Sequence, residues 1–375
     1  MITVEGRSYV SARVDGYTFP DSIHLVVAAV RSHPAFSLPT LTLIVLDTNR
    51  ELQNRLVEGA QIEILIAQKK ENNADWMPFR VFSYSPSPVP TYGMRYIIHG
   101  YWDYKSYLYD KVVRSYSGNS SFIIRRLAED GGLRALVDET TEDAQWYCPS
   151  KTLAEFVRQD VVPMSHGRED GYMMSVIDAR TRAWCYRDLN LVTENNQILS
   201  RLVNSSAVTP GEYNAFFSEY EYHNDSGYSN RLAYSMKNAV YNAVTGTYSE
   251  DADIRTVKTD SRLSVNTRDL PELSHVLYST LDFGNNGNGP KNRGRNLRQS
   301  ALWSIKMDVL LSTYTTFPLL TLHHIDVING QQGKDERQSG RYVCVGRVLA
   351  ATKSDYKERL CFIRNSENVD NSHLP

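Results

Sequence analysis

The alternation of apolar and polar residues is most regular near the C-terminus, over residues 339–365. Two runs rich in Tyr, Val and Leu, residues 341–349 and 356–363, flank the polar residues 352–355, and this order predicts an antiparallel hairpin. Both faces of the first strand carry apolar groups: Tyr342, Cys344, Gly346 and Val348 on one, Val343, Val345 and Leu349 on the other. We therefore expect a hairpin inside a barrel or sandwich, with its outer face covered by another domain or another subunit.

Strand patterns also dominate residues 1–115. Five short apolar runs are separated by turn residues: 23–30, 41–47, 61–67, 80–84 and 94–102. Between the second and third runs, Leu52 and Leu56 have helical spacing and Gly59 ends the segment, which indicates a short crossing helix or turn. Several short strands with turn signals predict a small barrel or sandwich.

Residues 116–190 mix helices with strands. A helix capped by Ser120 or Ser121 should bury one apolar stripe and stop at Gly131 and Gly132. The expected stripe contains Phe122, Ile123, Leu127 and Ala128. The elements that follow are a strand, a helix from a capping box to a proline, and a hairpin: 133–137, Thr152 with Glu155 to Pro163, and 172–178 with 182–187. This order predicts a small α/β domain.

Residues 191–365 return to strand patterns. The expected strands before the final hairpin are 213–223, 302–311 and 319–328. Residues 232–248 fit a strand or a helix, residues 284–298 have the composition of a flexible basic loop, and residues 366–375 that of a flexible tail. The sequence therefore predicts a mainly β protein in which a small α/β domain, 116–190, separates β domains at 1–115 and 191–365.

The composition excludes several classes of protein. The 375 residues suffice for two or three domains, and 41% hydrophobic with 22% charged residues excludes disorder of the whole chain. With a formal net charge of -2, the protein as a whole does not attract nucleic acid or an anionic membrane electrostatically. The 24 tyrosines fit two interpretations equally well: contacts between subunits that stay partly hydrated, and the ordinary preference of tyrosine for strands.

Cysteine spacing and the N-terminal residues argue against further classes of protein. Four cysteines, Cys148, Cys185, Cys344 and Cys361, lack CxxC spacing, so we expect reduced core cysteines rather than a zinc or redox site. Spacing alone leaves open whether Cys148 and Cys185 lie near each other. No secretory signal is expected, and the apolar run 25–30 is too short to cross a bilayer.

Two clusters resemble chemical sites, but a structural role is favoured for each. On a strand His324 and Asp326 share a face while His323 points away, and no third ligand is spaced for a metal. Four acidic residues, Asp138, Glu139, Glu142 and Asp143, could form a glycan-cleaving acid/base pair, although a solvated acidic face is the favoured interpretation. With no Ser-His-Asp or Cys-His arrangement either, we expect no catalytic residues, no metal and no cofactor.

The loop at 284–298 superficially resembles a phosphate-binding loop. Pro290 stands where GxxxxGK[ST] requires lysine, so an NTPase is not expected. Its basic residues are Lys291, Arg293, Arg295 and Arg298. They predict a contact with DNA or with an acidic surface of another protein, and the missing aromatic residues favour protein.

The order of several segments resembles the central baseplate hub protein of contractile-tailed phages, which is related to the base of the type VI secretion spike. The segments are LTLIVLDTNRELQNRLVEGAQIEILI with Leu56, Gly59, Ile62 and Ile64, SSFIIRRLAEDGGL, KTLAEFVRQ, YMMSVIDARTRAWCYRDL and SGRYVCVGRVLAATKSDYKERLCFIRN. Together they touch all three regions. The sequence departs from the family pattern at residues 322–328, where relatives often have a glycine-aspartate turn.

The resemblance implies a fold and a role. The fold would contain two tail-tube-like β-barrels joined by an α/β insertion. Three copies would present six barrels to a sixfold tail tube and receive a threefold central spike, so the protein would be a trimeric symmetry adaptor of a contractile injection system. Implied partners are the tube, spike and baseplate wedge proteins, with the tape measure protein as a further candidate and DNA passing only transiently through the lumen. The implied location is the virion, after synthesis in the host cytoplasm, without membrane insertion.

The final hairpin then belongs to the second barrel, and its outer face becomes a candidate subunit interface. The candidate residues are Tyr342, Val343, Val345, Val348, Tyr356 and Phe362. Two other functions remain open: a tail-associated peptidoglycan hydrolase that uses the acidic cluster, and a host-binding distal tail protein whose β domains carry receptor contacts on loops.

Overall fold

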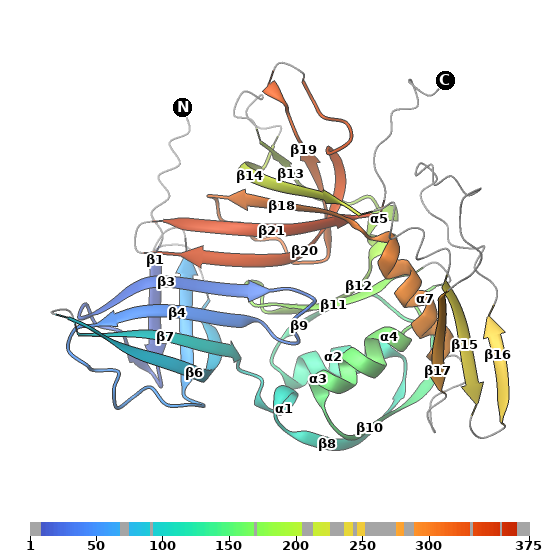
Figure 1. Cartoon of the computed structure of the whole chain (residues 1–375), viewed down its shortest axis with the longest axis horizontal. Coiled ribbons are helices and arrows are strands. Elements are labelled where there is room, and N and C mark those ends of the chain that lie inside the picture. Colours follow the sequence, from blue (N-terminus) through green and yellow to red (C-terminus); the bar gives the residue numbers. More distant parts are fainter. Residues whose placement is uncertain are drawn as a thin grey trace.

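The computed structural model describes residues 9–67, 75–90, 93–168, 171–204, 213–225, 236–242, 246–251, 275–280, 289–330, 333–352 and 355–365. We call residues 1–115 the first β region, 116–190 the α/β region and 191–365 the second β region. Figure 1 shows part of the second β region at the top and part at the right, the strands of the first β region at lower left and the helices of the α/β region at lower centre. No helix among the described residues has the length and apolar character needed to cross a membrane.

The first β region contains strands with alternating buried and partly exposed residues. Its elements are β1 (Tyr9–Val14), β2 (Tyr17–Thr18), β3 (Ile23–Ser32), β4 (Thr40–Asp47), β5 (Gln61–Ala67), β6 (Met77–Val89), β7 (Gly93–Trp102), α1 (Lys105–Leu108) and β8 (Lys111–Gly118). The order β3-β4-β7-β6-β5-β1 forms one sheet, and within the described ranges β1 and β3 do not pair. The five predicted strands are present. The segment with Leu52 and Leu56 forms turns that bury both leucines against the sheet.

The α/β region packs helices on a three-stranded sheet. Its elements are α2 (Ser120–Asp130), β9 (Arg134–Val137), β10 (Ala144–Thr152), α3 (Leu153–Phe156), the π-helical turn η1 (Val157–Val161), α4 (Val162–Met164), β11 (Met173–Asp178), β12 (Ala183–Asp188) and α5 (Leu189–Glu194). Helix α5 extends four residues beyond the boundary at residue 190. Strands β11, β12 and β9 form the sheet, while β10 pairs with β8. The capping box of Thr152 and Glu155 and the β11–β12 hairpin are confirmed.

Two details of α2 differ from the prediction. Asn119 caps the helix, since its side chain accepts from the Phe122 N–H, and neither Ser120 nor Ser121 does so. Phe122 is 49% exposed rather than part of the buried stripe. The buried stripe continues with Ile124 instead, because Ile123, Ile124, Leu127 and Ala128 follow helical periodicity more closely.

The second β region contains a closed barrel. Its elements are β13 (Ile198–Val203), β14 (Ala215–Asn224), β15 (Met236–Asn242), β16 (Thr247–Asp251), β17 (His275–Thr280), α7 (Gly289–Leu302), β18 (Ile305–Leu311), β19 (Thr321–Asp326), β20 (Gly340–Ala351) and β21 (Tyr356–Arg364). Six strands close in the order β19-β13-β14-β18-β21-β20, because β20 also pairs with β19. The mainly β class with a small α/β domain is thereby confirmed. Residues 236–242 and 247–251, ambiguous in sequence, are strands.

Strand β20 joins the two β regions edge to edge. Residues Gly340–Cys344 pair with β19, whereas Arg347–Ala351 pair with Ala28–Ser32 of β3. A register shift between Cys344 and Gly346 separates the two halves. The predicted burial of both faces is confirmed, and the cover comes from elements of the same chain.

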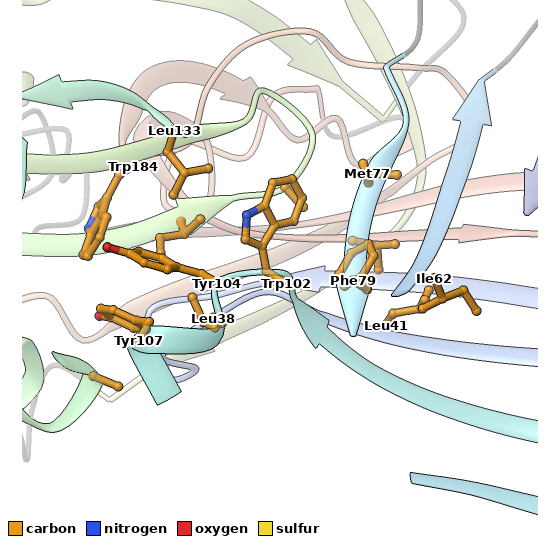
Figure 2. Close-up of a cluster of buried hydrophobic side chains, with 14 of the residues drawn as sticks. Leu38, Leu41, Ile62, Met77, Phe79, Trp102, Tyr104, Tyr107, Leu133 and Trp184 are labelled. Carbon is orange, nitrogen blue, oxygen red and sulfur yellow. The ribbon is translucent and has the colours of Figure 1, made fainter. Parts of the chain in front are cut away.

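The first β region and the α/β region share one hydrophobic core (Figure 2). Phe79 meets Trp102 edge to face at 5.6 Å, and Tyr107 meets Trp184 of β12 in the same way at 5.4 Å. The second barrel has a separate core, whose members include Val176 and Cys185 on the far face of the β11–β12 sheet. The α/β sheet therefore lies between the two cores.

Candidate functional site: the junction of the three regions

Arg347 lies where the three regions meet. It follows the register shift of β20, and its side chain is 1% exposed. Its guanidinium lies 2.7 Å from Asp178 of β11 and 2.8 Å from Glu358 of β21, and it donates to the Phe317 carbonyl at 2.6 Å. Burial alone would lower the pKa of Arg347, but the carboxylates of Asp178 and Glu358 outweigh it and raise that pKa. One buried cation is thus shared between the α/β region and the second barrel.

The turn between β11 and β12 inserts beside this cation and contacts the first β region. The Ala179 N–H donates to the Ser32 hydroxyl at 3.0 Å, and Arg180 donates to the Ile66 carbonyl at 2.8 Å. The Arg180 guanidinium also lies 3.3 Å from the centre of the Tyr314 ring. Burial lowers the pKa of Arg180 to about 10, so it stays a cation at neutral pH.

A glycine makes this close approach possible. A Cβ at Gly346 would lie 2.6 Å from the His33 ring and 3.3 Å from the Cβ of Cys361. His33 belongs to the segment between β3 and β4, so its ring packs on the bulge of β20 only because residue 346 lacks a side chain. The junction contains ion pairs, ring packing and backbone contacts, an arrangement suited to holding three regions in fixed relative positions.

The candidate interface residues of the hairpin are mostly covered within the chain. Tyr342, Val343, Val345, Tyr356 and Phe362 are buried, and Val348 is partly exposed. The barrel, the α/β sheet and β3 supply this cover. A contact with another subunit through these residues stays a prediction, which a single chain does not test.

The expectation of a flexible basic loop is wrong for residues 289–302, which form helix α7. Arg293 donates to the Gln159 carbonyl, and Arg295 lies 3.0 Å from Nδ1 of His166, so both contact the α/β region. The side chains of Lys291 and Arg298, and residues 284–288, lie outside the described part of the chain.

Helix α7 docks through a polar stripe. Asn296 donates to the carbonyls of Pro163 at 2.8 Å and Ser165 at 2.9 Å, and Asn292 donates to that of Met164 at 3.1 Å. These carbonyls are left free at the end of α4, so buried amides satisfy them. Asn292, Asn296 and Gln299 are all buried, at spacings of four and three residues. This spacing is typical of one face of a helix, but a pattern of apolar residues does not reveal it because the buried residues are polar.

His323, His324 and Asp326 have structural partners. His323 is buried between the hydroxyls of Ser200 and Thr321, at 2.6 and 2.9 Å, and burial lowers its pKa to about 3. His324 lies 3.0 Å from Asp326, as their shared strand face predicted. Burial would raise the Asp326 pKa, but hydrogen bonds from His324, Lys334 and Tyr213 lower it overall. In the described ranges, no group of three or more His, Cys, Asp and Glu side chains could hold a metal.

The sequence predicted that the acidic cluster is a solvated face. This prediction is wrong, because three of its members bind specific groups. Glu142 is buried and accepts from the Ser120 N–H at 2.8 Å, at the N-terminus of α2. Asp138 pairs with Arg187 at 3.2 Å and Glu139 with Arg125 at 2.5 Å. The unbonded N–H groups at a helix start attract such carboxylates.

All four cysteines are free thiols. Cys148 belongs to the core shared by the first two regions, whereas Cys185 and Cys344 belong to the barrel core. Cys148 and Cys185 therefore lie in different cores. Burial raises the pKa of each of the four thiols, which keeps them protonated at neutral pH.

Comparison with known proteins gives fold-level matches. No protein-family model matches the sequence, and no curated protein matches it. A 43 kDa tail protein of prophage MuSo2 from Shewanella oneidensis is 10% identical, with 96% of this chain and 98% of that chain covered and a TM-score of 0.58. A tail protein from Neisseria meningitidis MC58 is 9% identical, with the same coverage and a TM-score of 0.59.

A third structure links the fold to secretion systems. The E. coli c3393 protein, a component of the type VI secretion system with structural similarity to T4 bacteriophage tail proteins gp27 and gp5, is 8% identical. The alignment covers 97% of this chain and 80% of that one, with a TM-score of 0.51. At such identities the likeness establishes the fold, which confirms the expected resemblance to phage tail and baseplate proteins.

Proposed function

We propose that this chain, which shares the fold of phage tail proteins over nearly its whole length, is the structural hub of a phage baseplate. In this role three copies form a symmetry adaptor between a sixfold tail tube and a threefold central spike. The observation that carries the proposal is strand β20, which belongs to the closed barrel and also pairs with β3 of the first β region. A strand shared in this way holds two β regions as one unit, as a ring of six β regions from three chains requires.

The proposed partners follow from this position. Tube, spike and wedge proteins would contact the hub directly, with the tape measure protein as a further candidate, and DNA would pass transiently through the lumen. The basic residues of α7 are the proposed contact with an acidic surface of a neighbouring tail protein. The protein would reside in the virion after synthesis in the host cytoplasm, with no part inserted in a membrane.

The proposed role is structural rather than enzymatic. The carboxylates that suggested a hydrolase are engaged by the N–H groups and arginines around α2, β9 and β12. General acid catalysis requires a proton that the substrate can reach, and Glu142 is buried against the backbone of α2. This geometry favours a structural role for the cluster and thus supports the hub over the hydrolase.

Two measurements on the purified protein test the proposal. Light scattering should give a mass three times that of the 42.7 kDa chain. Mixed with the tail tube protein of the same phage, the trimer should cap tubes at one end in negative-stain electron microscopy. A monomer at all concentrations, together with uncapped tubes, would contradict the proposal.

A further inference from the structure

Strand β11 leaves one edge of the α/β sheet without a partner strand. The sheet order is β11-β12-β9, so β11 is an outer strand in the described structure. It lies between the second barrel and the helices of the α/β region (Figure 1). An unpaired edge presents N–H and C=O groups that can bind another extended segment.

The register identifies which residues face outward. Leu189 N–H donates to the Tyr172 carbonyl, so the backbone of Tyr172 points to β12. Successive residues of a strand point to alternate edges, so Met174 and Val176 also face β12, while the backbones of Met173, Ser175 and Ile177 face away. In the described structure, the outward N–H and C=O groups of these three residues take part in no hydrogen bond. Three residues of strand edge without a backbone partner therefore remain. Ser175 is partly exposed, whereas Met173 and Ile177 are 2% and 4% exposed, so an added strand would have to displace part of their cover.

A groove runs along this free edge. Two adjoining cavities of about 480 and 90 Å³ share Pro34, Val162 and Ser175 in their linings. Helix segments η1 and α4, helix α7 and the segment between β3 and β4 supply the walls. Most of the larger lining is apolar, and Leu297 and Phe36, 44% and 45% exposed, flank the two cavities. The edge is thus accompanied by apolar surface on which side chains of an added strand could pack.

The charge at the rim is positive. Arg158 lines the smaller cavity and Arg293 the larger, and neither forms an ion pair with a described acidic residue. The acid nearest in sequence, Asp160, is paired with Lys151 at 2.9 Å. Strand β8, one edge of the two-stranded β10–β8 sheet, carries Lys111 and Arg114, so a second copy that docked through this edge would be repelled by the rim. An acidic segment of another protein fits the charge.

We propose that the groove binds an extended acidic segment of a partner polypeptide, which adds to β11 as a fourth strand. Backbone bonds to Met173, Ser175 and Ile177 would supply affinity, and the apolar walls with Arg158 and Arg293 would select the sequence. The binding chemistry does not depend on the hub role, so failure of one leaves the other intact.

A labelled peptide tests the proposal on the full-length protein. The probe is fluorescein-EVTVTVE-amide, which alternates valine and threonine between terminal glutamates. We expect saturable binding and slower hydrogen exchange over residues 171–178. N-methylation of alternate residues decides the mode: methyl groups facing β11 should weaken binding at least about tenfold, while the opposite set should change it less than about twofold.

A matched pair of protein variants tests the rim. Arg158→Glu should weaken binding about tenfold, and Arg126→Glu, an equal charge change on the exposed side of α2, should not. No saturable binding of the probe at millimolar concentration, equal effects of both methylation patterns, or protection at a different strand would overturn the proposal. Self-association that protects residues 171–178 without the probe would assign the groove to a second copy instead.

Discussion

The guanidinium of Arg347 lies 2.7 Å from the carboxylate of Asp178, and both side chains are at most 1% exposed. The two residues are 169 positions apart and belong to different regions. Glu358 binds the same guanidinium, so one buried cation joins β11, β20 and β21. This contact, together with the pairing of β20 and β3, fixes the relative orientation of the regions.

Removal of the cation should destabilise the whole chain. Arg347→Met leaves two buried carboxylates without a partner, and we expect a loss of about 3–5 kcal/mol in the free energy of unfolding. The control is Arg341→Met on the same strand. This arginine is exposed and, among the described residues, its side chain hydrogen-bonds only Asn196, so we expect a loss below about 1 kcal/mol. Urea denaturation followed by tryptophan fluorescence measures both. Equal midpoints for the two variants would refute a central role for Arg347.

His323 should make the protein sensitive to acid. Burial lowers its pKa from 6.5 to about 3, so the folded chain holds the ring neutral while the unfolded chain protonates it. Its contribution to stability is therefore complete above pH 6.5 and is lost as the pH falls toward 3, at up to about 1.4 kcal/mol per pH unit. His33, whose pKa burial also lowers, adds to the same trend.

The variant His323→Gln separates this contribution from the others. Glutamine can still bond the Ser200 and Thr321 hydroxyls but does not titrate. Between pH 6.5 and 5 its unfolding free energy should fall less steeply than that of the wild type. Parallel curves would show that His323 is not the responsible group.

The packing of His33 on Gly346 predicts an unusual double mutant. Gly346→Ala places a methyl group 2.6 Å from the His33 ring and should cost about 1–3 kcal/mol. With His33→Ala the methyl group has space, so the double variant should be more stable than the sum of the single effects by about 1 kcal/mol. Thermal unfolding of the four proteins gives this coupling. Simple additivity would mean that the two residues do not touch.

The buried amide of Asn296 should hold α7 in place. Asn296→Leu leaves the Pro163 and Ser165 carbonyls unsatisfied, at a cost of about 1–3 kcal/mol. Hydrogen exchange over residues 289–302 should accelerate, whereas Leu297→Gln at the exposed neighbouring position should leave the rate near that of the wild type. Unchanged exchange in the Asn296 variant would mean that other contacts hold the helix.

Local patterns predicted many elements correctly but could not predict how they meet. The final hairpin and the capping box of Thr152 depend on residues close in sequence, and both are present. Strand β8 was missed because half of its residues are polar and exposed, so it lacks a clear alternation. Helix α7 has no apolar periodicity that would predict it, because its buried face consists mainly of Asn and Gln.

The candidate site itself was beyond local reasoning. The sequence places Asp178 at the end of a hairpin strand, and no pattern distinguishes Arg347 among the valines of its own strand. Their contact depends on the register shift of β20 and on the insertion of the β11–β12 turn between two β regions. The sequence predicted that both faces of β20 are buried. Only the tertiary structure shows that β3 and the α/β sheet are the elements that cover it.

A cryo-EM reconstruction of the assembled tail end tests the central claim most directly. If the chain is the hub, three copies will lie on the tail axis, between tube and spike, with six β regions arranged as one ring and β20 paired to β3 within each copy. Density for the chain away from the axis, or in a copy number other than three, would contradict it.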